Sequence, residues 1–156
     1  MSRTPSEIDK IADAWTTRMA ELSPGFATYI GYPGGEDRLD DESPEAAAAF
    51  IQEEKAVLAK LLAATPVDDT DRVTIDAMRN RIELAVETYD AGLHHRNMNV
   101  IASPAQGIRD IFDLSPTATE NDWKNLVGRM NDVANALEGY ERTLQQGIDE
   151  IGRAHV

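Results

Sequence analysis

Cysteine is absent from the 156-residue chain, and the aromatic residues Phe, Trp and Tyr make up only 6% of it. The lack of cysteine excludes disulfide bonds, thiol catalysis and cysteine-ligated zinc. No apolar run approaches the roughly 18 residues that a membrane-spanning helix needs, and the N-terminus has no basic-then-apolar leader. We therefore expect a cytoplasmic protein without a membrane partner.

Positive charge is also scarce. The chain has 15 Lys and Arg against 28 Asp and Glu, which gives a formal net charge of −13 at pH 7. Such a surface repels nucleic-acid phosphates and anionic lipid headgroups, so we expect no nucleic-acid partner. The length corresponds to about one domain, which is large enough to bury a core.

Hydrophobic periodicity predicts helices along almost the whole chain, because apolar residues recur every three or four positions. Six of the seven prolines follow Ser or Thr, which is typical of capped helix starts. Thr4-Pro5-Ser6-Glu7 and Ser103-Pro104-Ala105-Gln106 have the spacing of capping boxes. The sequence therefore predicts an all-α, elongated array of about six helices, without a strand, a repeat or a domain boundary.

The last predicted helix is the longest. From about residue 120 to 152 it would extend about 48 Å, whereas a globule of this chain length has a diameter of about 40 Å. Its apolar residues stay in register from Trp123 to Ile151, and no clear stop signal follows Gly152. Two explanations stay open at this point: an elongated bundle, or a segment cut from a larger protein.

Residue types that support chemistry are few. The only histidines are His94, His95 and His155, and without HExxH, HxH or HxxxH spacing a helix cannot present two histidine ligands. The acidic clusters at 36–37, 40–42 and 68–71 fit a solvated loop and a helix start better than a cation site. We expect no catalytic residue and no metal site in this chain.

Residues 96–110 lack a clean period and mix amides, arginines and apolar side chains. Buried amides must be hydrogen-bonded, so such a segment either threads the middle of a fold or borders a cleft. Within it, the stretch from Asn99 to Leu114, followed by Pro116-Thr117 and Trp123, resembles the N-terminal part of the bacterial family catalogued as domain of unknown function 885. The resemblance covers roughly residues 4–152, whereas members of that family are several times longer.

The family's members resemble helical zinc metallopeptidases, in particular thermostable metallocarboxypeptidases with an HExxH helix. In such enzymes two histidines one turn apart and a downstream glutamate hold zinc, and the motif glutamate activates water. None of these residues has an equivalent here, so the resemblance implies zinc only in a full-length parent and no activity in this chain alone.

The resemblance further implies that residues 1–156 form one N-terminal helical segment, incomplete at its C-terminal end, that lines a peptide cleft as a wall and partial lid. Gln106 and Arg109 are the candidate substrate-binding residues, because an arginine can bind a peptide carboxylate through two hydrogen bonds. The apolar stripe of residues 120–151 would pack on the remainder of the parent chain or lead to self-association.

Two other classes of function stay open. In the first, the chain is a stand-alone interaction or dimerisation module whose stripe at 120–151 docks another helix. In the second, it is a small binding protein with a pocket near His94 to Arg109. The sequence alone does not distinguish these alternatives.

Overall fold

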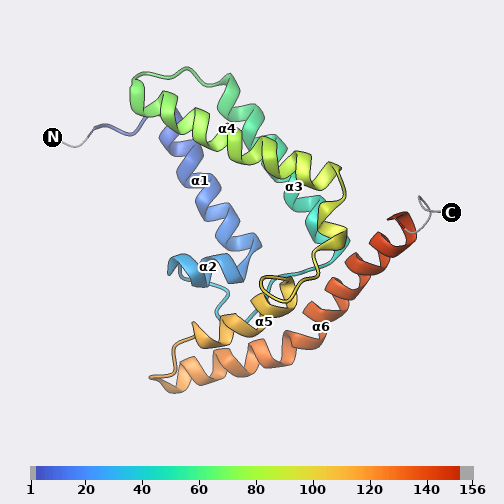
Figure 1. Cartoon of the computed structure of the whole chain (residues 1–156). Coiled ribbons are helices and arrows are strands. Elements are labelled where there is room, and N and C mark those ends of the chain that lie inside the picture. Colours follow the sequence, from blue (N-terminus) through green and yellow to red (C-terminus); the bar gives the residue numbers. More distant parts are fainter. Residues whose placement is uncertain (1–2, 152–156) are drawn as a thin grey trace.

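The computed structural model describes residues 3–151, and within that range it contains helices and no strand (Figure 1). The helices are α1 (Glu7–Leu22), α2 (Pro24–Ile30), α3 (Pro44–Ala63), α4 (Asp69–Asp90), the 3-10 helix η1 (Leu93–Arg96), α5 (Pro104–Asp113) and α6 (Glu120–Ile151). The prediction of an all-α chain of about six helices is confirmed. The interpretation of residues 1–156 as an incomplete segment stays a prediction. His155 lies outside the described residues.

The helices begin where the local chemistry satisfies their first N–H groups. Ser23, Ser43 and Ser103 precede a proline at the first helical position of α2, α3 and α5, where the missing N–H removes no bond. The predicted start at Thr4-Pro5 is wrong by two residues, because Ser6 is the cap and exchanges hydrogen bonds with Asp9.

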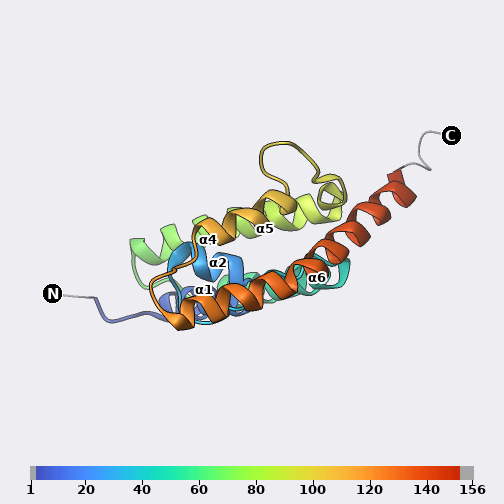
Figure 2. The same cartoon turned by 90° about the horizontal axis from the view of Figure 1, so that it is seen from below.

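The molecule has two arms (Figure 1). The first arm consists of α1, α3 and α4, which pack on one another, and the second consists of α5 lying along α6. The short helix α2 contacts both α1 and α5 and so joins the arms at one end, while η1 joins α4 to α6 at the other. The C-terminal half of α6 runs well past the first residues of α5 (Figure 2).

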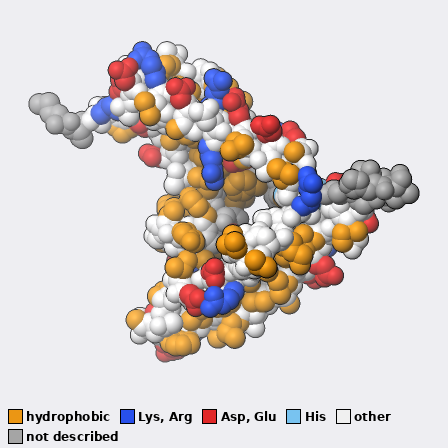
Figure 3. All heavy atoms as spheres, viewed as in Figure 1, with side chains coloured by type: hydrophobic (Ala, Val, Ile, Leu, Met, Phe, Trp, Pro, Cys, Tyr) orange, Lys and Arg blue, Asp and Glu red, His pale blue; other side chains and the backbone are white. Residues whose placement is uncertain are grey.

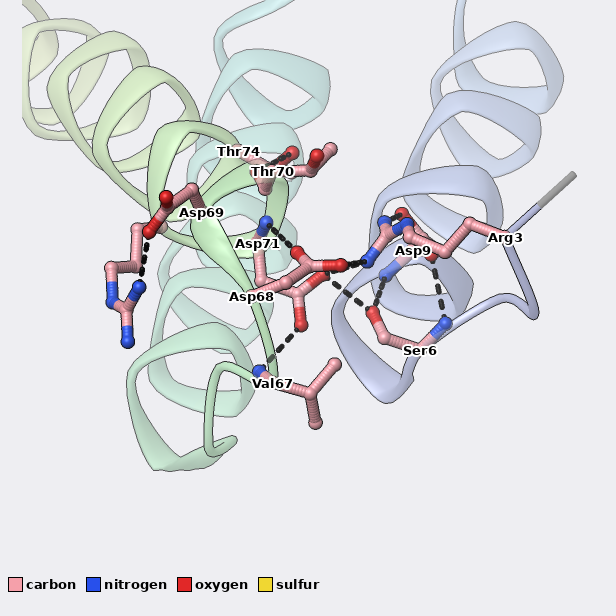
Figure 4. A network of polar contacts seen from close by, with 10 residues as sticks. Arg3, Ser6, Asp9, Val67, Asp68, Asp69, Thr70, Asp71 and Thr74 are labelled. Atoms are coloured by element: carbon pink, nitrogen blue, oxygen red, sulfur yellow. Dashed lines mark hydrogen bonds and ion pairs between the residues drawn. The ribbon is translucent and has the colours of Figure 1, made fainter. Parts of the chain in front are cut away.

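A polar network ties the start of α1 to the start of α4 (Figure 4). The guanidinium of Arg3 donates to Asp68, Asp71 and Asp9, and the fully buried Asp71 also accepts from the Ser6 hydroxyl and the Val67 backbone N–H. The hydrogen bond from Val67 is the main reason that the pKa of Asp71 is lower than its ordinary value. The first arm is therefore joined at this end by charge as well as by packing.

Hydrophobic burial in the second arm is modest. Its core cluster consists of Leu39, Ile108, Ile111 and Ala136, with Phe112 and Val133 packed against it.

The whole chain exposes 10173 Å², whereas a compact protein of this mass exposes about 7,800 Å². The seven terminal residues that are not described would contribute at most about 1,100 Å² even if fully extended, so the difference comes mainly from the open arrangement of the helices.

Candidate interaction surface

One face of α6 packs against the rest of the molecule. The residues buried on this face include small ones as well as large ones: Leu126, Arg129, Ala136, Gly139, Tyr140, Thr143 and Gly147. A Cβ atom at Gly139 would lie 2.9 Å from the Ser43 nitrogen, and one at Gly147 would lie 2.3 Å from the His95 carbonyl oxygen. The two glycines allow α6 to approach the backbone of two other segments closely.

A second face of α6 is apolar and faces solvent. The exposed fractions are 57% for Trp123, 54% for Val127, 64% for Met130, 42% for Leu137 and 64% for Ile148. These positions, with Ala134 and Leu144 between them, are spaced alternately by four and three residues except at Glu141. Such spacing is typical of a helix that packs along another helix. We call Trp123, Val127, Met130, Leu137 and Ile148 the exposed α6 stripe.

The hydrophobic period alone predicts one stripe that contains all these residues together with Leu126, Val133 and Tyr140. The structure divides this stripe, since Leu126 and Tyr140 are buried and Val133 is half-buried, whereas the exposed α6 stripe has no cover in the described part of the chain. The side chain of Ile151, which ends the predicted stripe, lies outside the described residues. Figure 3 shows apolar side chains gathered along this second arm.

The loop before α5 adds more exposed apolar surface. Met98, Val100 and Ile101 are each more than two-thirds exposed. The backbone of the loop is nevertheless fixed, because the Asn99 side chain accepts from the N–H groups of Ile101 and Ala102. At the base of the loop, the Tyr140 hydroxyl of α6 donates to the carbonyl of residue 97.

Gln106 and Arg109, the predicted substrate-binding residues, both lie on α5. The Gln106 carbonyl accepts from the Ser103 backbone N–H, and its amide donates to the Asn99 carbonyl, so this side chain organises the preceding loop. The Arg109 side chain is 74% exposed and pairs with Asp110 and Asp113 of its own helix. Arg109 is thus accessible to a ligand, whereas Gln106 is occupied by local hydrogen bonds.

His94 and His95 line a polar pocket of about 490 Å³ between η1, the start of α3 and the end of α6. The His94 ring stacks on the Tyr89 ring, with 4.4 Å between the ring centroids. Burial is the main cause that lowers the pKa of His94, and the proximity of His95 lowers it further. His95 Nδ1 lies 3.1 Å from a carboxylate oxygen of Glu150 but is not aligned for a hydrogen bond. Residues 3–151 contain no group of three or more His, Cys, Asp or Glu side chains placed to hold a metal ion.

Comparison with protein families identifies one match, described as "Bacterial protein of unknown function (DUF885)", over residues 24–155. The match spans more than four-fifths of the chain. The chain belongs to this bacterial family. A search of curated proteins finds no match. The matched region of this DUF885 member contains the exposed α6 stripe, the apolar loop, Gln106 and Arg109.

The chain also contains a buried junction around Arg129 that the hydrophobic period does not predict. Arg129, only 1% exposed, donates to the hydroxyls of Thr28 and Ser115 and to the Arg38 carbonyl, and so connects α6 to α2, the loop after α2 and the end of α5. Burial lowers the pKa of Arg129, and the nearby carboxylates of the 36–40 loop oppose this shift. The sequence does contain one indication of this junction, because Arg129 lies between Leu126 and Val133 on the face of α6 that packs against the rest of the chain.

None of the described helices of this DUF885 member combines the length and the hydropathy needed to cross a membrane.

Proposed function

We propose that this chain is an N-terminal helical wall of a larger, zinc-metallopeptidase-like protein and that the exposed α6 stripe is the surface on which the rest of that protein packs. The stripe is the observation that carries the proposal. Five large apolar side chains face solvent along one helix, and soluble monomers rarely leave a patch of this kind uncovered. The chain belongs to the DUF885 family, and the sequence resemblance to helical metallopeptidases would imply a longer protein.

The amount of exposed surface supports the same proposal. The chain exposes 10173 Å², about 2,400 Å² more than a compact protein of its mass. At least about 1,300 Å² of this difference belongs to the described helices, whereas one partner in a standard interface buries about 800 Å². The described helices together therefore offer enough surface for extensive contact with further helices.

In such an enzyme the chain itself would form part of the structural wall and would help to bind the peptide substrate. The zinc ligands and the water-activating glutamate would come from the rest of the protein, since the described residues offer no metal site. Arg109 would face the cleft, where its exposed guanidinium can bind a peptide carboxylate in exchange for its solvent-exposed partners Asp110 and Asp113. Gln106 would act by holding the apolar loop in place.

The alternative function is a stand-alone dimerisation module that uses the same exposed α6 stripe. The stripe favours this candidate too, because its four-three spacing suits a helix from a second copy. Charge opposes it, since each copy carries −13 and like-charged surfaces repel. The two candidates differ in whether the contacts of the stripe lie within one polypeptide or between two.

The test begins with the coding sequence downstream of Val156, where we expect an in-frame continuation to an HExxH motif. Met130→Glu and the control Asn131→Glu, which adds the same charge at a neighbouring exposed position, are then compared in the 156-residue chain and in the complete protein. Only Met130→Glu in the complete protein should lower the melting temperature. A 156-residue chain that dimerises until Met130→Glu separates the copies would favour the alternative, and no effect in either protein would overturn both.

A further inference from the structure

A second apolar surface lies on the first arm, between α3 and α4. It is a groove of about 740 Å³ whose apolar lining includes Leu58, Ala59, Leu62 and Val86. Leu62 is 52% exposed. The groove is distinct from the exposed α6 stripe, because every residue that lines it belongs to α3, to α4 or to the residue that follows α4.

The lining residues follow the helical period on both walls. On α3 they occupy positions 55, 58, 59 and 62, and on α4 they include positions 83, 86, 87 and 90. Each wall is therefore one face of a helix over two turns, about 10 Å long at 1.5 Å per residue. An open groove of this length, with a small residue at position 59, fits about two turns of another helix lying along it.

Charge distinguishes the two walls. Glu83, Glu87 and Asp90 line the α4 side, whereas Lys55 is the only charged lining residue from α3. Lys55 lies 3.6 Å from Asp90, and Arg79, one turn before the groove, pairs with Glu83. Glu87 forms no ion pair in the described part of the chain. The α4 side of the groove thus presents a net negative edge beside an apolar floor.

We propose that this groove binds an amphipathic helix of a partner protein, one that carries Leu-like side chains on one face and Lys or Arg along the edge that meets α4. The apolar face of the partner would cover Leu58, Leu62 and Val86, and its basic edge would meet Glu83 and Glu87. A second copy of this chain does not fit this description well, because its net charge of −13 opposes approach to an acidic edge.

The probe is a fluorescein-labelled helical peptide with Leu at positions i, i+3, i+4 and i+7 and Lys along one flank. A matched peptide carries Glu in place of Lys. Binding to the 156-residue chain is measured by fluorescence anisotropy at low and at physiological salt. We expect the Lys peptide to bind, the Glu peptide to bind at least tenfold more weakly, and the difference to shrink as salt rises.

Two pairs of variants locate the binding. Ala59→Glu fills the groove, and Ala56→Glu adds the same charge at an exposed position of α3 outside it. Glu87→Lys reverses the acidic edge, and Asp76→Lys is its control on an exposed part of α4. Ala59→Glu and Glu87→Lys should each weaken the Lys peptide at least tenfold, and the two controls should change its affinity less than twofold.

The proposal would be overturned by the absence of binding, by equal binding of the two peptides, or by controls that match their groove variants. Self-association of the chain that Ala59→Glu abolishes would also overturn it, in favour of a second copy. Circular dichroism and the melting temperature of each variant test whether the helices are retained. None of these substitutions touches α6, so the result is independent of the test of the exposed α6 stripe.

Discussion

Arg129 and Thr28, separated by 101 positions in the sequence, are joined by a hydrogen bond of 2.6 Å from the Nη2 atom of the arginine to the hydroxyl of the threonine. The same guanidinium donates to the Ser115 hydroxyl and to the Arg38 carbonyl. Within residues 3–151, Arg129 contacts no carboxylate directly, although burial makes its charge costly. The hydroxyls and the carbonyl therefore solvate a charged group that holds α6 against three other segments.

Arg129→Lys tests this junction, because it keeps the charge and removes the three-way geometry of the guanidinium. We expect a loss of about 1–3 kcal/mol in the free energy of unfolding, which is the usual effect of leaving buried polar groups unpaired. Urea denaturation followed by circular dichroism measures it. Arg142→Lys is the control, since the ion pair of Arg142 with Glu45 is exposed and should change stability by less than about 1 kcal/mol. Equal losses in the two variants would show that Arg129 is not a junction.

Gly147→Ala and Gly107→Ala form a matched pair of substitutions within helices. A Cβ atom at Gly147 would meet the His95 carbonyl oxygen at 2.3 Å, whereas one at Gly107 would meet no atom of the described residues within 4 Å. We expect Gly147→Ala to destabilise the chain by about 1–3 kcal/mol, because α6 and η1 must separate. Gly107→Ala should stabilise it by about 0.4–1 kcal/mol through reduced freedom of the unfolded chain. The close approach of α6 to η1 would be refuted if both alanine variants melted above the original protein.

Glu42→Gln tests a pH dependence. Burial, followed by the nearby Asp40 and Asp41, raises the pKa of Glu42 to about 7. A carboxyl whose pKa is higher in the folded state than in the unfolded state stabilises the fold at low pH, and this contribution is lost as the pH rises through about 7. Glu42→Gln should therefore be more stable than the original chain above pH 7, by about 1–3 kcal/mol, with the difference disappearing towards pH 4.

Thermal unfolding from pH 4 to pH 9 gives this difference directly. Glu138→Gln, on the exposed side of α6, serves as the control because it removes one negative charge from the same protein. A Glu42→Gln variant whose advantage did not grow with pH, or grew no more than that of Glu138→Gln, would contradict the raised pKa of Glu42.

Arg109→Ala separates recognition from packing. In the part of the chain that the structure describes, the arginine pairs only with Asp110 and Asp113 of its own helix, and its side chain is 74% exposed. Its removal should therefore shift the melting temperature by less than the equivalent of about 0.5 kcal/mol. In the complete protein that we propose, turnover of peptides should fall while stability is retained. A marked loss of stability instead would assign Arg109 to packing.

The sequence was sufficient for features that are determined locally. The Ser-Pro pairs at 23–24, 43–44 and 103–104 identified three helix starts, and the persistent apolar period identified a final helix that ends in the structure at Ile151. These features depend on capping and periodicity within a few residues. Gly31 adopts the left-handed conformation at the C-terminus of α2, where a glycine in the sequence is typical of a helix end.

Features that depend on distant segments were not found. The division of the α6 stripe into a covered and an exposed face is determined by where Arg38, Ser43 and His95 lie, and the sequence gives no measure of these distances. Arg129 was missed for the same reason. The capping box recognised at Ser103 includes Gln106, whose side chain has the predicted local partner; its role in substrate binding stays a prediction.

The open arrangement of the two arms has a consequence for how the chain unfolds. The slope of stability against denaturant concentration follows the surface newly exposed on unfolding, and a molecule that already leaves so much surface in water has less to expose. The free energy of unfolding of this chain will therefore fall less steeply with urea concentration than that of a compact protein of the same length. Amide hydrogens in the last turn of α6, beyond the contact of Gly147 with His95 of η1, will exchange with solvent by local fraying well before those of the α1, α3 and α4 arm.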